Sequence, residues 1–333
     1  MGINKIMNRI KNITILIVLI LSSYFRDLYA NDGILAGAFL RMGLGARANA
    51  MGGAFTGIAE GPAAAYYNPA GIPFMETREL ILSYRFLSLD RNFNYVGFAT
   101  GIRPKIEEDE SDEVALNGGL ALSWVHAGVD KIDGRDFSGN HYQDFSNAEH
   151  AFALSFGLMP LDILSVGLTA KVLYNRLPKM GDNDATISET GLGLDLGILI
   201  KPTPYLSLGF TVKDINAKYN WKTDKLWEKD IDKIDRFPQT FRGGIALRYP
   251  YPWLIFAVDI EKNDQQDMKY FVGTEALFME KIAARAGLNN GSITLGGGYS
   301  FQLFSKPVQI QYAFVTKKYD VASEHIFSWI FNL

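Results

Sequence analysis

From residue 79 to its end, the chain is a succession of segments about ten residues long in which every second side chain is apolar. A period of two is that of a β-strand whose two faces meet different surroundings. In the clearest segment, Val166 and Leu168 lie on one face, and Gly167 and Lys171 lie on the other. The pattern therefore predicts strands with one apolar face and one glycine-rich, charged face.

The alternating segments number fourteen, an even number that is typical of single-chain bacterial barrels. They lie near residues 79–88, 94–103, 116–127, 147–158, 164–175, 187–201, 205–213, 237–249, 252–261, 268–278, 281–289, 291–302, 306–317 and 321–333. Connections after even-numbered segments are mostly short, and three connections after odd-numbered segments are long, at 128–146, 176–186 and 214–236. Short turns on one side and long loops on the other are typical of outer-membrane barrels.

The last segment carries an aromatic face to the end of the chain, formed by Phe327, Trp329, Phe331 and Leu333. The main alternative is a soluble β-sandwich, in which one face of such a strand would carry charged residues and face water. After residue 30, no run of 18 apolar residues occurs that could form a transmembrane helix. The sequence therefore predicts an all-β fold: a transmembrane antiparallel β-barrel of about 14 strands over residues 79–333.

The first thirty residues have the pattern of a secretory signal peptide. Lys5, Arg9 and Lys11 precede an apolar run at 13–21, and Ala30 offers a small residue for cleavage. A single membrane anchor is the alternative, but nine apolar residues are too few to span the hydrocarbon core. We therefore predict a signal peptide over residues 1–30 and export to the outer membrane of a Gram-negative-type envelope.

Composition narrows the possible partners. The formal net charge of −3 becomes −6 once residues 1–30 are removed, since 29 basic and 35 acidic residues remain. A mildly acidic chain argues against a nucleic-acid partner. The chain has no cysteine, which excludes disulfides and thiolate metal sites.

Residues 31–78 form a separate block in which small residues replace the alternation. Asn68 followed by Pro69 is a helix-start signal, because the amide can cap and proline needs no N–H donor. The block resembles the PorV/PorQ family of outer-membrane proteins and, more distantly, the fatty-acid transporter FadL. The residues that carry this resemblance are Phe39, Leu40, Arg41, Gly45, Arg47, Met51, Gly52, Gly53, Asn68, Pro69, Ala70 and Gly71. One departure is the stretch 59–62, where the family often has aspartates.

The resemblance implies that this block folds back into the barrel as a plug with short helices. A fourteen-stranded barrel does enclose more space than its own side chains fill. We expect Arg41 and Arg47 to face a charged lumen, although solvation at the periplasmic rim is an alternative. The lumen-facing residues expected from the alternation are Lys171, Asp195, Asp259, Glu261, Glu275 and Arg285.

The sequence offers little catalytic chemistry. The four histidines have no metal-binding spacing, and neither H-E-x-x-H nor G-x-S-x-G occurs. His126 with a serine of a neighbouring strand, such as Ser155, could be forced into the role of a nucleophile pair, but a histidine in a barrel wall is usually polar lining. Asp182-Asn183-Asp184 with Glu189 lacks the glycine of a calcium loop. We therefore predict no catalytic residues, no metal and no cofactor.

Two functions follow from the resemblance. The first is a non-enzymatic component of protein secretion to the cell surface, which binds a large translocon protein or a secreted cargo domain. The alternative is a FadL-like channel for hydrophobic small molecules such as long-chain fatty acids, and a purely structural barrel is a third possibility. Outer-membrane lipid is a partner in each case. Exposed aromatic residues in the loop 214–236 could bind a protein or line an entry groove: Tyr219, Trp221 and Trp227.

Overall fold

The structure, a computed structural model, describes residues 35–104, 116–180, 185–221, 233–316 and 322–333. The expected signal peptide lies outside these residues and remains a prediction. Among the described residues, no helix combines the length and apolar character needed to cross a membrane.

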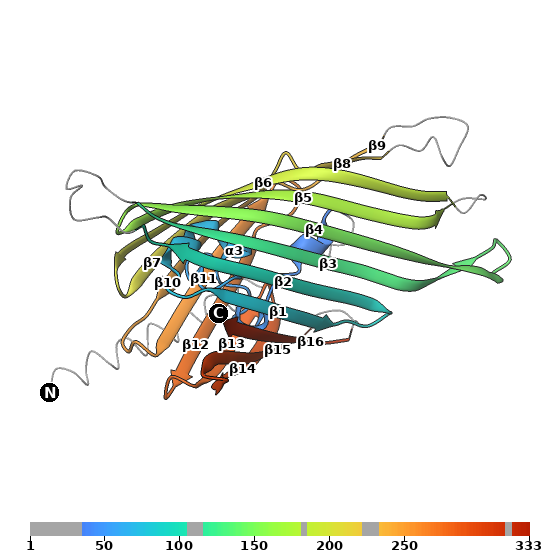
Figure 1. The fold of residues 1–333 in the computed structure, drawn as a ribbon. Helices are drawn as coiled ribbons and strands as arrows, with labels where there is room; N and C mark the ends of the chain where they lie inside the picture. Colours follow the sequence, from blue (N-terminus) through green and yellow to red (C-terminus); the bar gives the residue numbers. More distant parts are fainter. Residues whose placement is uncertain (1–34, 105–115, 181–184, 222–232, 317–321) are drawn as a thin grey trace. The chain divides into compact units, whose positions relative to one another are not determined.

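Fourteen antiparallel strands close into a barrel, as predicted (Figure 1). They are β1 (Glu79–Phe86), β2 (Arg91–Ile102), β3 (Asn117–Arg135), β4 (His141–Leu161), β5 (Leu164–Met180), β6 (Ala185–Thr203), β7 (Leu206–Ile215), β10 (Thr240–Leu247), β11 (Leu254–Asn263), β12 (Lys269–Phe278), β13 (Ile282–Asn289), β14 (Ser292–Leu303), β15 (Lys306–Val315) and β16 (Glu324–Asn332). The first strand pairs with the last, so the described barrel has no open sheet edge between them. A separate two-stranded sheet joins β8 (Lys218–Trp221) to β9 (Lys233–Arg236).

The predicted alternation of the two faces is confirmed in strands far apart in the barrel. In β5, Val166 and Leu168 are exposed on the outer face, whereas Lys171 is buried on the inner face. In β16, Trp329 is exposed on the outer face, while its neighbour Ser328 is fully buried. These strands therefore turn an apolar face outward and a polar or small-residue face toward the lumen.

Aromatic side chains border the outer apolar band at both ends. At the end with the short turns, the exposed aromatic residues are Tyr205, Tyr249, Tyr251, Trp253, Phe278 and Phe304. At the opposite end, on β3 to β5, the rings of Trp124, His126, His150, Phe152 and Tyr174 stack on one another. Two aromatic girdles around an apolar band are typical of barrels in an outer membrane.

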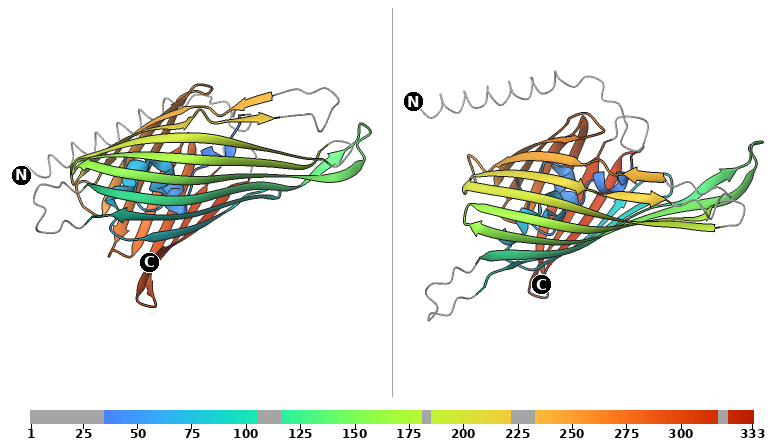
Figure 2. Two further views of the ribbon diagram at one scale, coloured as in Figure 1. Left: turned by 45° about the horizontal axis from the view of Figure 1, so that its top comes forward. Right: turned by 90° about the horizontal axis from the view of Figure 1, so that it is seen from above.

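The prediction of long loops at 128–146 and 176–186 is wrong in part, because strands extend into these segments. Residues 128–146 belong mostly to β3 and β4, which leave only a turn at 136–140, and β5 and β6 also run into 176–186. These extensions project beyond the rest of the barrel (Figures 1 and 2). Beyond the apolar band both faces of a strand meet water, so its sequence need not alternate.

The N-terminal block lies inside the barrel (Figure 2). Its helices are η1 (Ala38–Arg41), α2 (Ala46–Ala50), α3 (Ala64–Tyr67) and η2 (Pro69–Phe74). The helix start expected at Asn68 is confirmed, since its side chain accepts a hydrogen bond from the Ala70 N–H at 3.1 Å. The barrel therefore has a plug of short helical turns.

Candidate functional site

The glycine-rich inner face is where the plug backbone meets the wall. A Cβ atom placed on Gly167 would lie 2.4 Å from the backbone nitrogen of Ala70, and one on Gly273 would lie 2.3 Å from the Met51 carbonyl oxygen. Such distances are far inside van der Waals contact, so only glycine permits this approach. Alternation alone places these glycines on the inner face, and the plug explains their residue type.

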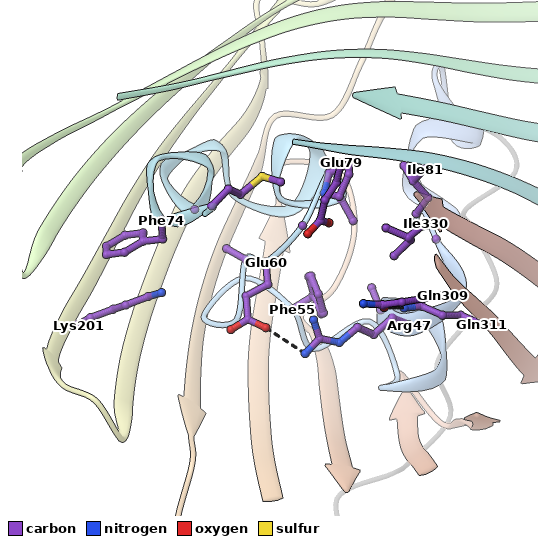
Figure 3. Close-up of a pocket in the computed structure, with 18 residues that line it drawn as sticks. Arg47, Phe55, Glu60, Phe74, Glu79, Ile81, Lys201, Gln309, Gln311 and Ile330 are labelled. Carbon is purple, nitrogen blue, oxygen red and sulfur yellow. Dashed lines mark hydrogen bonds and ion pairs between the residues drawn. The ribbon is translucent and has the colours of Figure 1, made fainter. Parts of the chain in front are cut away.

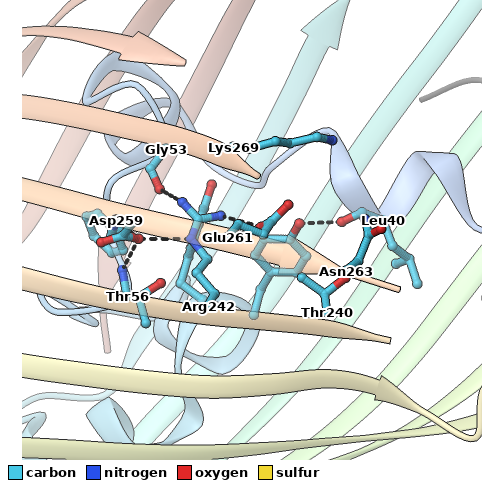
Figure 4. A network of polar contacts seen from close by, with 12 residues as sticks. Leu40, Gly53, Thr56, Thr240, Arg242, Asp259, Glu261, Asn263 and Lys269 are labelled. Atoms are coloured by element: carbon cyan, nitrogen blue, oxygen red, sulfur yellow. Dashed lines mark hydrogen bonds and ion pairs between the residues drawn. The ribbon is translucent and has the colours of Figure 1, made fainter. Parts of the chain in front are cut away.

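Asp259 of β11 ties the plug to the wall at a fully buried position. Its carboxylate accepts hydrogen bonds from the backbone N–H groups of Phe55 and Thr56, at 3.0 and 2.9 Å. The same oxygen accepts from Nε of Arg242 at 2.9 Å (Figure 4). Arg242 also donates to Glu261 at 3.1 Å and to the Gly53 carbonyl. One carboxylate thereby joins the plug to a charged pair on the wall.

Arg47 of the plug pairs with two carboxylates. Its guanidinium lies 2.6 Å from Glu275 of the wall and 3.0 Å from Glu60 of the plug. Glu275 also accepts from Arg285, and Glu60 from Arg248. Burial opposes ionisation of Glu60, but the charges of Arg47 and Arg248 outweigh it and hold the pKa of that carboxyl below its ordinary value.

Arg41, the other arginine expected to face the lumen, donates hydrogen bonds to the backbone carbonyls of Ala36 and Leu35, at 2.9 and 3.2 Å. It helps to fold the entering segment of the plug on itself. The plug is held further by Arg85 of β1, which donates to the carbonyls of Met42 and Gly43 at 2.8 Å and pairs with Glu324. Arg85 is not among the lumen residues predicted from the sequence, although its place in the alternation puts it inside.

Lys171 and Asp195 belong to another buried charged group, which lies where β7 ends. Lys171 Nζ lies 2.7 Å from Asp195 and also pairs with Asp214. The backbone N–H of Asp214 donates to Asp195 at 2.8 Å. Asp214 and Asn216 both have left-handed backbones, with φ of 60° and 56°, which turns the chain sharply toward β8. All six residues expected in the lumen are thus buried, in separate groups.

A cavity of about 290 Å³ lies at the end of the lumen that carries the short turns (Figure 3). Its polar lining residues are Arg47, Glu60, Glu79, Lys201, Gln309 and Gln311, and its larger apolar ones are Phe55, Phe74, Met75, Ile81 and Ile330. Both plug and wall contribute. The alternation does not predict the cavity, because it depends on how plug and wall fit together.

Of the aromatic residues expected on the exposed loop 214–236, Tyr219 lies in the apolar core instead. Tyr219 is only 2% exposed, and its ring packs against Phe237 and Trp221 at centroid distances of 5.1 and 5.6 Å. The prediction that Tyr219 is exposed is therefore wrong, because β8 turns inward and joins the apolar core. Trp221 is partly buried against that core, and Trp227 lies outside the described residues.

The conceivable nucleophile pair does not form. Ser155 is fully buried on the inner face and shares a hydrogen bond with Thr169 at 2.7 Å. His126 lies on the outer face, where its ring stacks on that of His150 at 4.5 Å. The barrel wall therefore separates Ser155 from His126. The calcium-like residues 182–184 lie outside the described residues.

The fold and its plug define a class: closed fourteen-stranded barrels whose lumen is filled by an N-terminal block. A comparison with solved structures finds this fold in the monoaromatic hydrocarbon channel CymD, at 15% identity and a TM-score of 0.59, over 87% of this chain and 98% of that one. The toluene transporter TodX of Pseudomonas putida is 14% identical with a TM-score of 0.57, over 87% and 99%. These identities establish a shared fold alone. No protein-family model matches the chain, and no curated protein is similar enough to serve as a relative.

Proposed function

We propose that the protein is a non-enzymatic outer-membrane channel for small hydrophobic molecules. The observation that carries the proposal is a shared fold along nearly the whole length of two hydrocarbon channels. Of the two functions expected from the sequence, this is the alternative, and the PorV/PorQ secretion role has no support from the comparisons.

The interior of the barrel supports the same proposal. An apolar cluster that includes Phe39, Leu40, Phe93 and Tyr219 fills part of the lumen and reaches the cavity through Ile81 and Ile330. The cavity at the short-turn end has apolar surface from the plug and the wall. Apolar surroundings favour a hydrophobic solute over a hydrated one, since the latter would lose its water.

Uptake by intact cells tests the proposal, because a lipopolysaccharide outer membrane slows the entry of hydrocarbons. Cells that lack a hydrocarbon channel of their own should take up labelled toluene faster when they produce this protein. They should not admit labelled sucrose. A variant that lacks residues 37–75 should admit both solutes, because the plug is gone. Toluene uptake equal to that of cells with an empty vector would refute the channel.

A role in protein secretion is a second candidate, favoured by the projecting β3–β4 hairpin. The hairpin exposes Phe137 fully and Tyr142 by 60% of its surface, and exposed aromatic residues are common at protein interfaces. A cross-linker attached to a cysteine in place of Asn140 should then capture a large translocon protein in native membranes. Capture of lipid alone would count against this role.

A further inference from the structure

We propose that residues 59–61 of the plug, here called the strap, form a movable gate on the cavity at the short-turn end, and that the ion pair between Glu60 and Arg248 holds this gate closed. The inference rests on the proposed function, since a gate at this end would control the release of solutes from the plugged lumen. Three properties of the strap support it: its position, its backbone and the kind of contact that holds it.

The strap lies between the cavity and the end of β10. Ala59, Glu60 and Gly61 all line the cavity, whose volume is about 290 Å³ (Figure 3). Glu60 also pairs with Arg248, the residue that follows β10 at the short-turn end. An apolar cavity of roughly 150 Å³ is enough to bind benzene in another protein, so a single ring compound fits beside the strap.

Fixed contacts flank the strap on both sides. Before it, the backbone N–H groups of Phe55 and Thr56 donate to the buried carboxylate of Asp259. After it, the Pro62 carbonyl accepts a hydrogen bond from the hydroxyl of Tyr95 at 3.1 Å. The strap can therefore move while these contacts keep the rest of the plug in place.

The backbone of the strap is strained and makes few hydrogen bonds. Ala59 and Gly61 are both left-handed, with φ of 44° and 65°, and this conformation is unfavourable for alanine. In the described part of the chain, the N–H groups of Glu60 and Gly61 donate no hydrogen bond. Strained residues with few hydrogen bonds are typical of segments that change conformation.

The contact that holds the strap is weak enough to break. The side chains of Glu60 and Arg248 are 32% and 37% exposed, so water can solvate both charges once they separate. Arg47, the second partner of Glu60, keeps its pair with Glu275 at 2.6 Å. The strap can therefore move without leaving a charge buried and unpaired.

The pair between Asp259 and Arg242 differs in this respect. Its side chains are 0% and 9% exposed, so separation would leave the Asp259 carboxylate buried without its partner. This pair fixes the plug to the wall permanently, whereas the pair of Glu60 with Arg248 can open and close.

The test joins the strap to the wall by a reversible cross-link. The chain has no cysteine, so a variant with Glu60→Cys and Arg248→Cys can be joined at these two positions by a bis-methanethiosulfonate reagent. Before the reaction the variant lacks the ion pair, and its conductance in planar bilayers should exceed that of the unaltered protein by about two- to fivefold, as expected for the loss of one partly exposed pair. The cross-link should abolish this increase, and a reductant should restore it.

Two controls separate the gate from other effects. A monofunctional methanethiosulfonate adds similar bulk at both cysteines without joining the strap to the wall, and it should leave the conductance high. Glu60→Gln keeps the size of the side chain and should raise the conductance by a similar factor. Glu76→Gln changes an exposed glutamate outside the cavity and should leave it unchanged.

Conductance that does not respond to the cross-link would overturn the gate, and so would equal conductance in Glu60→Gln and the unaltered protein. The two proposals fail separately. Toluene uptake that does not respond to the cross-link leaves the channel standing without the gate. Conductance that responds to the cross-link in a protein without toluene uptake leaves the gate standing without the hydrocarbon channel.

Discussion

Two sides of the barrel differ in height and in how they hold the plug. Strands β3 to β6 are 17 to 21 residues long, whereas β10 to β16 are 8 to 12 residues long. The long side contacts η2, and the short side contacts α2. We call β3 to β6 the tall wall and β10 to β16 the low wall. The plug therefore contacts both walls.

The contacts on the two walls are of different kinds. On the tall wall, Gly167 and Gly197 let Pro69 approach the strands more closely than any side chain would allow. On the low wall, buried carboxylates such as Asp259 and Glu275 accept hydrogen bonds from the plug. Steric contact depends on residue size alone, whereas a charged contact depends on its partners. The low wall is thus the side where single polar changes can loosen the plug.

The largest effect is expected from Gly167→Val on the tall wall. The new Cβ would lie 2.4 Å from the Pro69 carbonyl carbon and the Ala70 nitrogen, so η2 must move away. Overpacking of this kind typically costs about 1–3 kcal/mol and sometimes more. Ion conductance in planar bilayers should rise well above that of the unaltered protein.

Gly243→Val is the matched control, because nothing lies within 4 Å of a Cβ at that position. It changes the same residue type on β10 and should leave the conductance unchanged. Equal conductance in the two variants would show that η2 does not seal the tall wall.

A smaller effect is expected from Asp259→Ala on the low wall. The change leaves Arg242 without one carboxylate and two backbone N–H groups without an acceptor. Arg242 keeps its pair with Glu261, so the loss is that of hydrogen bonds to buried donors, typically about 1–3 kcal/mol, and other contacts still hold the plug. Conductance should rise less than in Gly167→Val, and protease should cleave the plug faster.

Asp162→Ala, in the exposed turn between β4 and β5, removes a carboxylate without such contacts and serves as the control. The triple variant Arg242→Met, Asp259→Ala and Glu261→Gln should be more stable than Asp259→Ala alone, since it leaves no charge of this group without a partner. No recovery in the triple variant would mean that the backbone hydrogen bonds, not the charges, carry the effect.

The barrel itself was predictable from sequence, because lipid outside and a filled lumen inside impose a period of two. Val166 and Lys171, five residues apart on one strand, illustrate the apolar outer face and the polar inner face. The tall wall was not predictable beyond the girdle, since residues such as Asp133 and Gln143 face water on both sides. Alternation identifies a strand only where its two faces differ.

The candidate site was predictable only in its parts. Their positions in the alternation placed Asp259 and Glu275 on the inner face of the barrel. Their pairing with Arg242 and Arg47, however, depends on strand register and on the path of the plug. The inward turn at Asp214 has only a weak signal in the sequence, since Asp and Asn tolerate a left-handed backbone in many loops, so Tyr219 was expected outside. Contacts between distant segments arise from the fold as a whole.

The smallest effect concerns the tip of the tall wall, far from the plug. Asp136 accepts hydrogen bonds from the backbone N–H groups of Asn140 and Ser138, at 2.8 and 2.9 Å. The Asn140 N–H in particular holds the pKa of Asp136 below its ordinary value.

The order that the Asp136 carboxylate gives the turn is therefore present at neutral pH and lost as the pH falls through the lowered pKa. Asp136→Ala should lower the protection of the Ser138 and Asn140 N–H groups against hydrogen exchange at neutral pH and remove the pH dependence of that protection factor, whereas Ser138→Ala keeps its backbone donor and should behave as the unaltered chain. Conductance should not change in either variant, and a rise in Asp136→Ala would mean that the tip and the plug are coupled.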